Sequence, residues 1–119
     1  MQKLNLVKDS TELRKAIAEN PELPIVVMIG RESASDEYAY TYCEAVKAEV
    51  GEVLNCHTPW SEEIYNDRIE FEEDMADYLC DNPEYKNVSD EEFENALEAE
   101  KEKYEPYWIK AIIVKAYNY

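Results

Sequence analysis

Glycine and histidine are scarce in this sequence. The 119 residues include two glycines, Gly30 and Gly51, and one histidine, His57. Phosphate-cradling loops of the P-loop or dinucleotide-binding type need several closely spaced glycines, so neither motif is present. His57 directly follows Cys56, and sequence neighbours rarely present the geometry of a Cys–His nucleophile, because a third group must orient the base. The sequence therefore argues against an enzyme, and it offers no catalytic residue.

Cysteine is also limited, to Cys43, Cys56 and Cys80. The number is odd, and the spacing contains no C-x2–4-C knuckle of the kind that holds zinc. We therefore expect free thiols, no metal site and no cofactor. Free thiols are typical of a reducing compartment, so the cytosol is the expected location.

Long apolar runs are missing. No stretch approaches the roughly 18 apolar residues that a membrane-spanning helix needs. The first ten residues, MQKLNLVKDS, lack the apolar segment of a signal peptide. With 45% hydrophobic residues, the chain is long enough to bury one core. We expect residues 1–119 to form a single α+β domain without a membrane partner.

Positively charged residues are far fewer than negatively charged ones. The chain has 12 Lys and Arg residues against 28 Asp and Glu residues, a formal net charge of −16. Between Glu62 and Glu105 there are 18 acidic and 4 basic residues. Such a segment repels nucleic acid and anionic lipid and attracts basic protein surfaces. We therefore expect no direct binding of DNA or RNA.

The first half of the chain predicts one helix followed by strands. Asp9 with Glu12 resembles a capping box, and the helix should end near Glu19, before two prolines. The run 25–29 (IVVMI) predicts a buried strand. The alternation in 37–43 predicts a second strand with three tyrosines on one face. Residues 45–54 favour a third strand, in which Gly51 would mark a bulge or kink. An amphipathic helix also fits these residues.

The second half predicts two acidic helices and a last strand. Residues 63–66 (EIYN) predict a short edge strand. Phe71, Met75 and Leu79 give a helix capped by Asp67 or Asn66, and Ser89 with Glu92 begins another that ends at Glu105. The apolar run 107–117 predicts a strand covered on both faces or paired centrally. The fold class is α+β, a mostly antiparallel sheet of about four strands with three helices packed on it, two of them strongly acidic.

Acidic residues recur on one side of each acidic helix. Like charges at i,i+4 destabilise a helix by roughly 0.2–0.5 kcal/mol per pair, and few lysines relieve the repulsion. An ordinary solvated face remains the competing interpretation. The binding interpretation is that the acids imitate two lines of phosphate and enter a basic groove. Its residues are Glu70, Asp74, Asp77 and Asp81 on the first helix and Glu91, Glu94, Glu98, Glu102 and Glu105 on the second.

Aromatic residues supply candidate anchors for the same partner. Tyr38, Tyr40 and Tyr42 alternate along one expected strand, and Trp60 lies in the loop after residue 54. Tyrosine and tryptophan are enriched at protein interfaces. Their ordinary role in core packing is the alternative.

Four stretches carry a resemblance to a known group. LPIVVMIG, DEYAYTYCEAVKAEVGEVL, YNDRIEFEEDMADYL and YEPYWIKAIIVKAY resemble small acidic proteins encoded by phages and prophages of Gram-positive bacteria. In size, charge and lack of catalytic motifs the chain is similar to anti-CRISPR inhibitors that imitate nucleic acid. The resemblance transfers no catalytic or binding position.

Three functions follow as hypotheses. The first is a phage-type inhibitor whose acidic helices occupy a basic channel of a host nucleic-acid-binding protein, a Cas effector nuclease being one example. The second is a phage structural or regulatory protein that forms a homo-oligomer through its apolar strands. The third is a small hydrolase or metal-binding domain.

Overall fold

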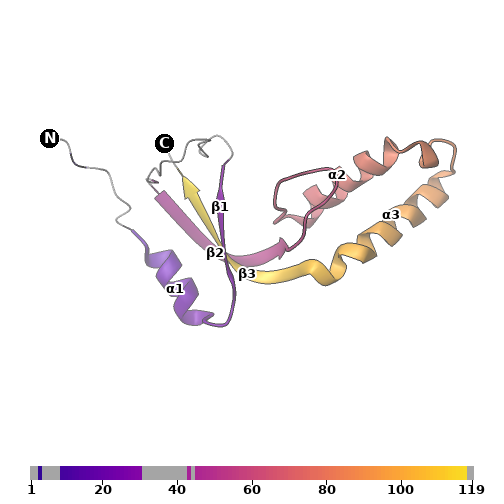
Figure 1. Cartoon of the computed structure of the whole chain (residues 1–119). Helices are drawn as coiled ribbons and strands as arrows, with labels where there is room; N and C mark the ends of the chain where they lie inside the picture. Colours follow the sequence, from indigo (N-terminus) through magenta and orange to yellow (C-terminus); the bar gives the residue numbers. More distant parts are fainter. Residues whose placement is uncertain (1–2, 4–8, 31–42, 44, 118–119) are drawn as a thin grey trace. The chain divides into compact units, whose positions relative to one another are not determined.

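A computed structural model of the chain describes residues 3, 9–30, 43 and 45–117 (Figure 1). They form two compact units: unit 1 comprises Met1–Gly51 and Lys110–Tyr119, and unit 2 comprises Glu52–Ile109. The elements, in chain order, are α1 (Thr11–Glu19), β1 (Ile25–Ile29), β2 (Ala45–Leu54), α2 (Arg68–Cys80), the 3-10 turn η2 (Pro83–Tyr85), α3 (Asp90–Tyr104), the 3-10 turn η3 (Glu105–Tyr107) and β3 (Trp108–Tyr117).

The three described strands form one mixed sheet in the order β1-β3-β2. β1 pairs in parallel with β3, with Ile25 opposite Ile112 and Ile29 opposite Ala116, whereas β2 runs in the opposite direction to β3 (Figure 1). The α+β class with three helices is confirmed, but the four mostly antiparallel strands are not. The strand expected over 37–43 falls almost wholly outside the described residues. Parallel pairing of β1 with a strand more than eighty residues away leaves no local signal in the sequence.

Unit 1 has a small aliphatic core on one face of the sheet. Ala16 of α1 packs with Ile112 and Val114 of β3. All four residues from Ala111 to Val114 are buried, and β3 lies between the other two strands. The expectation of a centrally paired last strand is confirmed. The partly buried side chains of Leu13, Leu23, Val46 and Ala48 complete this core.

The choice of strand for 45–54 is also confirmed. Gly51 lies within β2 and its backbone is not in the left-handed region. A Cβ atom at this position would come within 3.0 Å of Ile113 Cδ1. The glycine therefore provides room for a neighbouring side chain in unit 1.

Unit 2 has a separate core, centred on Phe71, Met75 and Leu79 of α2. These residues recur every four positions, so one side of the helix is buried, as the periodicity predicted. Leu54 and Tyr65 are buried in the same cluster. Partly buried residues that pack against it come from the flanking segments and from α3: Cys56, Trp60, Tyr85, Phe93, Leu97, Tyr104 and Trp108.

Side-chain caps begin both acidic helices. Asp67 accepts hydrogen bonds from the backbone N–H groups of Ile69 and Glu70, and Ser89 accepts one from Glu92. Each cap satisfies donors that the first helical turn leaves unpaired, and both helix starts were predicted from these residues.

Two local expectations are corrected. The N-cap of α1 is Ser10 and its side chain makes no capping bond. Asp9 instead accepts a hydrogen bond from Thr11 N–H at 3.0 Å, which lowers the pKa of Asp9. Residues 63–66 form no strand, because the only backbone bond that Tyr65 makes to β2 is from Leu54 N–H to Tyr65 O.

Within the described residues no helix combines the length and the apolar character required to cross a membrane.

The expectation of a single folding domain leads to the first prediction. β2 and β3 each cross from one unit to the other, so we expect Phe71→Ala in unit 2 and Ile112→Ala in unit 1 to destabilise one shared transition. Each removes a fully buried side chain and should lower the free energy of unfolding by about 2–5 kcal/mol.

Urea unfolding followed by two probes measures this. Both tryptophans, Trp60 and Trp108, belong to unit 2, so fluorescence reports on unit 2 and far-ultraviolet circular dichroism on the whole chain. Coincident curves in wild type and both variants are expected. Two separate transitions, each moved by only one variant, would show two independently folding units.

Candidate functional site

The negative charge is divided unequally between the two units. Unit 2 contains 19 acidic and 4 basic residues, a net charge of −15. Unit 1 contains 9 acidic and 8 basic residues, a net charge of −1. An electrostatic partner surface, if the chain has one, is therefore on unit 2.

The acidic part of unit 2 is a hairpin of α2 and α3, which lie side by side and are joined through η2 (Figure 1). Lys101 of α3 bridges the two helices: its Nζ lies 2.8 Å from Glu72 Oε1 and 3.9 Å from Glu98 Oε1. The hydrogen bond to Glu72 raises the pKa of Lys101. The ammonium group thus links the two acidic helices.

A second cation, Arg68, links the start of α2 to the residue that follows α3. Arg68, the first residue of α2, places Nη2 2.7 Å from Glu52 Oε2 and Nη1 2.9 Å from Glu105 Oε2. Its guanidinium carbon also lies 4.6 Å from the centre of the Trp108 ring. The hydrogen bond to Glu105, followed by that to Glu52, raises the pKa of Arg68, and the pKa of Glu105 is lowered by the same contact.

Most acids of the hairpin have no such partner. Lys103 pairs with Glu100 at 2.6 Å, so three of the four cations in unit 2 are occupied by ion pairs. Lys86, the fourth, forms none among the described residues. The carboxylates of α2, α3 and their connection that make no ion pair within the described part of the chain are Glu70, Glu73, Asp74, Asp77, Asp81, Glu84, Asp90, Glu91, Glu92, Glu94 and Glu102.

The acidic row of α2 lies on the flank away from α3. Asp74 is half-buried, and its Oδ2 accepts a hydrogen bond of 2.6 Å from the hydroxyl of Tyr65. Glu72, which faces α3, is two positions from Asp74, and two positions correspond to about 200° around a helix. Glu70, Asp77 and Asp81 share the flank of Asp74 by their spacing, and all three are exposed.

The acidic row of α3 lies on a different flank of the hairpin from the acidic row of α2. Glu98 contacts Lys101, the residue that reaches α2, and Glu91, Glu94 and Glu102 share its side of the helix by their spacing. All four are exposed. The two predicted rows are therefore on different flanks of one hairpin, separated by the outer side of α2, and do not form adjacent parallel lines.

The aromatic anchors expected from the sequence have different outcomes. Tyr38, Tyr40 and Tyr42 lie outside the described residues, so their role stays a prediction. Trp60 is half-buried in the core of unit 2, where its Nε1 donates to the Tyr65 hydroxyl at 2.9 Å. Its ring centroid lies 5.2–5.8 Å from those of Tyr78, Tyr104 and Phe71. These contacts give Trp60 a packing role, and its role as an anchor for a partner stays a prediction.

Ile69 is an exposed apolar residue that sequence reasoning missed. Its exposed fraction is 68%, the highest among the large exposed hydrophobic residues of the described chain. It lies two positions before Phe71 and therefore points away from the core. Four positions on is Glu73, which has no ion pair. The signal was present in the sequence, because Ile69 does not fit the apolar stripe of Phe71, Met75 and Leu79.

Two pockets lie elsewhere on the described surface. The one in unit 2 is lined by Cys56, His57, Glu62 and neighbouring residues. Burial raises the pKa of the Cys56 thiol, which disfavours the thiolate and so makes it a poor nucleophile. No group of three or more Cys, His, Asp and Glu residues is positioned to hold a metal ion in the described part of the chain.

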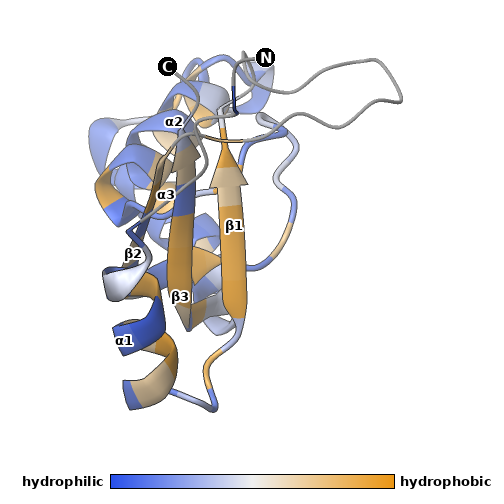
Figure 2. Cartoon of the chain, turned by 90° about the vertical axis from the view of Figure 1, so that its left-hand side faces the viewer, coloured by the Kyte–Doolittle hydropathy of each residue, from blue (hydrophilic) through white to orange (hydrophobic). Residues whose placement is uncertain are grey.

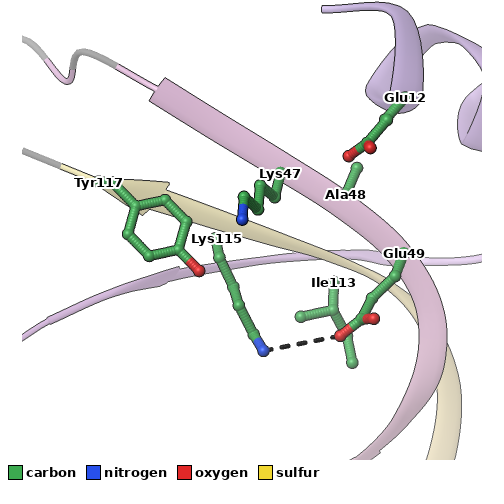
Figure 3. A pocket seen from close by; sticks show the side chains of 7 residues that line it. All are labelled: Glu12, Lys47, Ala48, Glu49, Ile113, Lys115 and Tyr117. Atoms are coloured by element: carbon green, nitrogen blue, oxygen red, sulfur yellow. Dashed lines mark ion pairs between the residues drawn. The ribbon is translucent and has the colours of Figure 1, made fainter.

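The other pocket, of about 470 Å³, lies in unit 1 (Figure 3). It contains one ion pair, in which Lys115 Nζ is 3.6 Å from Glu49 Oε1, and Lys47 Nζ is 5.7 Å from the centre of the Tyr117 ring. The same pocket is lined by Glu12. With two ammonium and two carboxylate groups, it presents no net charge to a ligand.

Comparison of the chain with protein-family models, with curated proteins and with solved structures gave no match.

The contacts of Arg68 lead to the second prediction. Arg68→Ala should lower the free energy of unfolding by about 1–2 kcal/mol, because it removes two partly exposed ion pairs and a cation–π contact. The loss should be smaller in high salt, which screens the ion pairs. Urea unfolding at low and high salt measures both effects.

Lys86→Ala is the matched control. It removes the same charge from unit 2 but no ion pair within the described residues, so it should change stability by less than about 0.5 kcal/mol. Equal effects of the two substitutions would contradict the assignment of Arg68 as a structural cation.

Proposed function

We propose that the protein is a non-enzymatic inhibitor that binds a basic, nucleic-acid-binding surface of another protein through the acidic hairpin of unit 2. The bound protein would be a host defence nuclease, such as a Cas effector, whose cationic channel normally receives DNA or RNA. The main support for this proposal is the difference in net charge between the units, which is −15 for unit 2 and −1 for unit 1.

The ion pairs support this assignment more than the total charge does. Two of the three cations of unit 2 that make ion pairs link separate elements: Lys101 joins α3 to α2, and Arg68 joins the start of α2 to Glu52 and Glu105. Most other carboxylates of the two helices make no ion pair within the described residues. A partner that supplies Lys and Arg side chains would relieve their mutual repulsion, which is a favourable contribution to binding.

The arrangement of the acids indicates how the partner would surround the hairpin. Because the row on α2 and the row on α3 occupy different flanks, a flat basic surface would meet only one of them. A channel, by contrast, presents cations on opposing walls and would reach both. The exposed side chain of Ile69 lies on the outer side of α2 and provides an apolar anchor within the acidic surface.

Neutralising part of the α3 row tests the proposal. The triple variant Glu91→Gln, Glu94→Gln and Glu102→Gln should reduce capture of nucleic-acid-binding proteins from bacterial lysate by at least about tenfold, corresponding to about 1.4 kcal/mol. The reason is loss of attraction, since none of these residues makes an ion pair within the described chain. Immobilised protein, quantitative mass spectrometry of captured proteins and a salt series measure it.

The matched control is the triple variant Glu12→Gln, Glu19→Gln and Glu22→Gln, which removes the same charge from exposed positions of unit 1. It should capture as the wild type does. Added duplex DNA should release the captured proteins, because it competes for the same basic channel. Capture that DNA does not displace, or that survives neutralisation of the α3 row, contradicts the proposal.

The role of Ile69 gives a separate prediction. Ile69→Ala should weaken capture by about fivefold to tenfold, about 1–1.4 kcal/mol, while leaving the unfolding midpoint unchanged because the side chain is exposed. Ile64→Ala, an exposed isoleucine of unit 2 outside the hairpin, is the control. If both variants capture as the wild type does, Ile69 is an ordinary surface residue.

A further inference from the structure

β1 is an edge strand of the described sheet, because β3 lies on one side of it and no other described strand lies on the other. Its five residues, Ile25–Ile29, are all apolar (Figure 2). Ile25, Val27 and Ile29 alternate along the strand and remain exposed by 50%, 61% and 58%. This is the longest row of exposed large apolar side chains on one described element.

The position of α1 explains why the row is open. In the parallel register Ile25 lies opposite Ile112 and Val27 opposite Val114, so these side chains share the sheet face that α1 covers. The core beneath α1 takes residues from β3 and β2 but none from β1. Helix α1 thus covers β3 and β2 on this face of the sheet and leaves β1 uncovered.

Edge strands of monomeric proteins are usually protected by a charge, a proline or a bulge. β1 contains none of these between Ile25 and Ile29. It presents both an apolar row and backbone groups suited to pairing with another strand, and an edge of this kind is typical of an interface.

The charge distribution indicates a second copy of the chain as the occupant. A basic partner would be attracted to unit 2 and would gain nothing from a strand without charge. Two copies repel through their unit 2 surfaces, but unit 1 has a net charge of only −1. Contact through unit 1, which contains β1, therefore costs less in electrostatic repulsion between copies than contact through unit 2.

The pattern of β1 is also self-complementary. The three exposed residues are centred on Val27, so antiparallel pairing about a twofold axis places Val27 opposite Val27 of the second copy. Ile25 then lies opposite Ile29 of the second copy, and every apolar side chain meets another. A twofold axis through the middle of a strand pair is the geometry of an isologous interface.

We propose that two copies associate through antiparallel pairing of β1, which joins the two sheets into one continuous sheet. A five-residue strand pair buries less area than the roughly 1,200–2,000 Å² of a standard stable interface, so the dissociation constant should be in the micromolar range. The proposal rests on unit 1 and does not depend on the function proposed for unit 2.

Charge reversal at the twofold axis tests it. Val27→Lys and Val27→Glu should each be monomeric, because like charges would lie directly opposite one another. An equimolar mixture of the two variants should restore the dimer, since every pair at the axis then carries opposite charges. Light scattering coupled to size-exclusion chromatography, from about 1 μM to about 1 mM, measures the molecular mass.

Val50→Lys is the control, because Val50 is an exposed apolar residue of β2 in the same unit; it should dimerise as the wild type does. Ile29→Lys is a second variant in β1 and should also weaken the dimer. A wild type that stays monomeric throughout the range overturns the proposal. So does a dimer that Val27→Lys leaves intact, or a variant mixture that remains monomeric although circular dichroism shows each variant folded.

Discussion

The packing of aromatic rings around Phe71 is the interaction on which unit 2 depends. Its ring centroid lies 5.4–5.8 Å from those of Trp60, Tyr65, Tyr104 and Trp108, and each such pair contributes about 0.5–1.5 kcal/mol beyond simple burial. Repulsion between neighbouring carboxylates costs only about 0.2–0.5 kcal/mol per pair on a helix. Burial therefore outweighs the repulsion of an acidic surface, provided that the apolar side of each helix stays packed.

Cations have a local role in this balance. Lys101 lies where α2 meets α3, and Arg68 joins the start of α2 to Glu52 and Glu105. Both neutralise carboxylates at positions where two elements approach, so they stabilise the fold without neutralising the outer surface. The same placement leaves the flanks of the hairpin available to a basic partner, which connects the stability of unit 2 with its proposed function.

Local patterns predicted the parts of the fold that depend on local physics. The four-residue recurrence of Phe71, Met75 and Leu79 and the caps at Asp67 and Ser89 placed both acidic helices. The apolar run before Gly30 placed β1, but the expectation that this strand is buried was wrong, because alternate residues from Ile25 to Ile29 are exposed. Contacts between distant segments were not predictable. The parallel pairing of β1 with β3 has no local signature, and the burial of Trp60 depends on Tyr65, Phe71 and Tyr104 arriving at the same place.

The candidate surface divides in the same way. Helical spacing identified which acids share a side of each helix, but not that Asp74 is held by Tyr65 or that the row on α2 faces away from α3. Those facts depend on how the hairpin closes. The exposure of Ile69, in contrast, follows from the spacing alone.

The central place of β3 in the sheet has a consequence for biosynthesis. β1 and β2 are not neighbours in the sheet, and both require β3, the last of the described strands in sequence order, as their partner. While the ribosome is still translating the acidic helices, β1 and β2 have already been made but lack the strand that lies between them. The edge of β1 that pairs with β3 is thus unpaired in the nascent polypeptide until Trp108–Tyr117 has been translated, a period in which chaperones would have access to it.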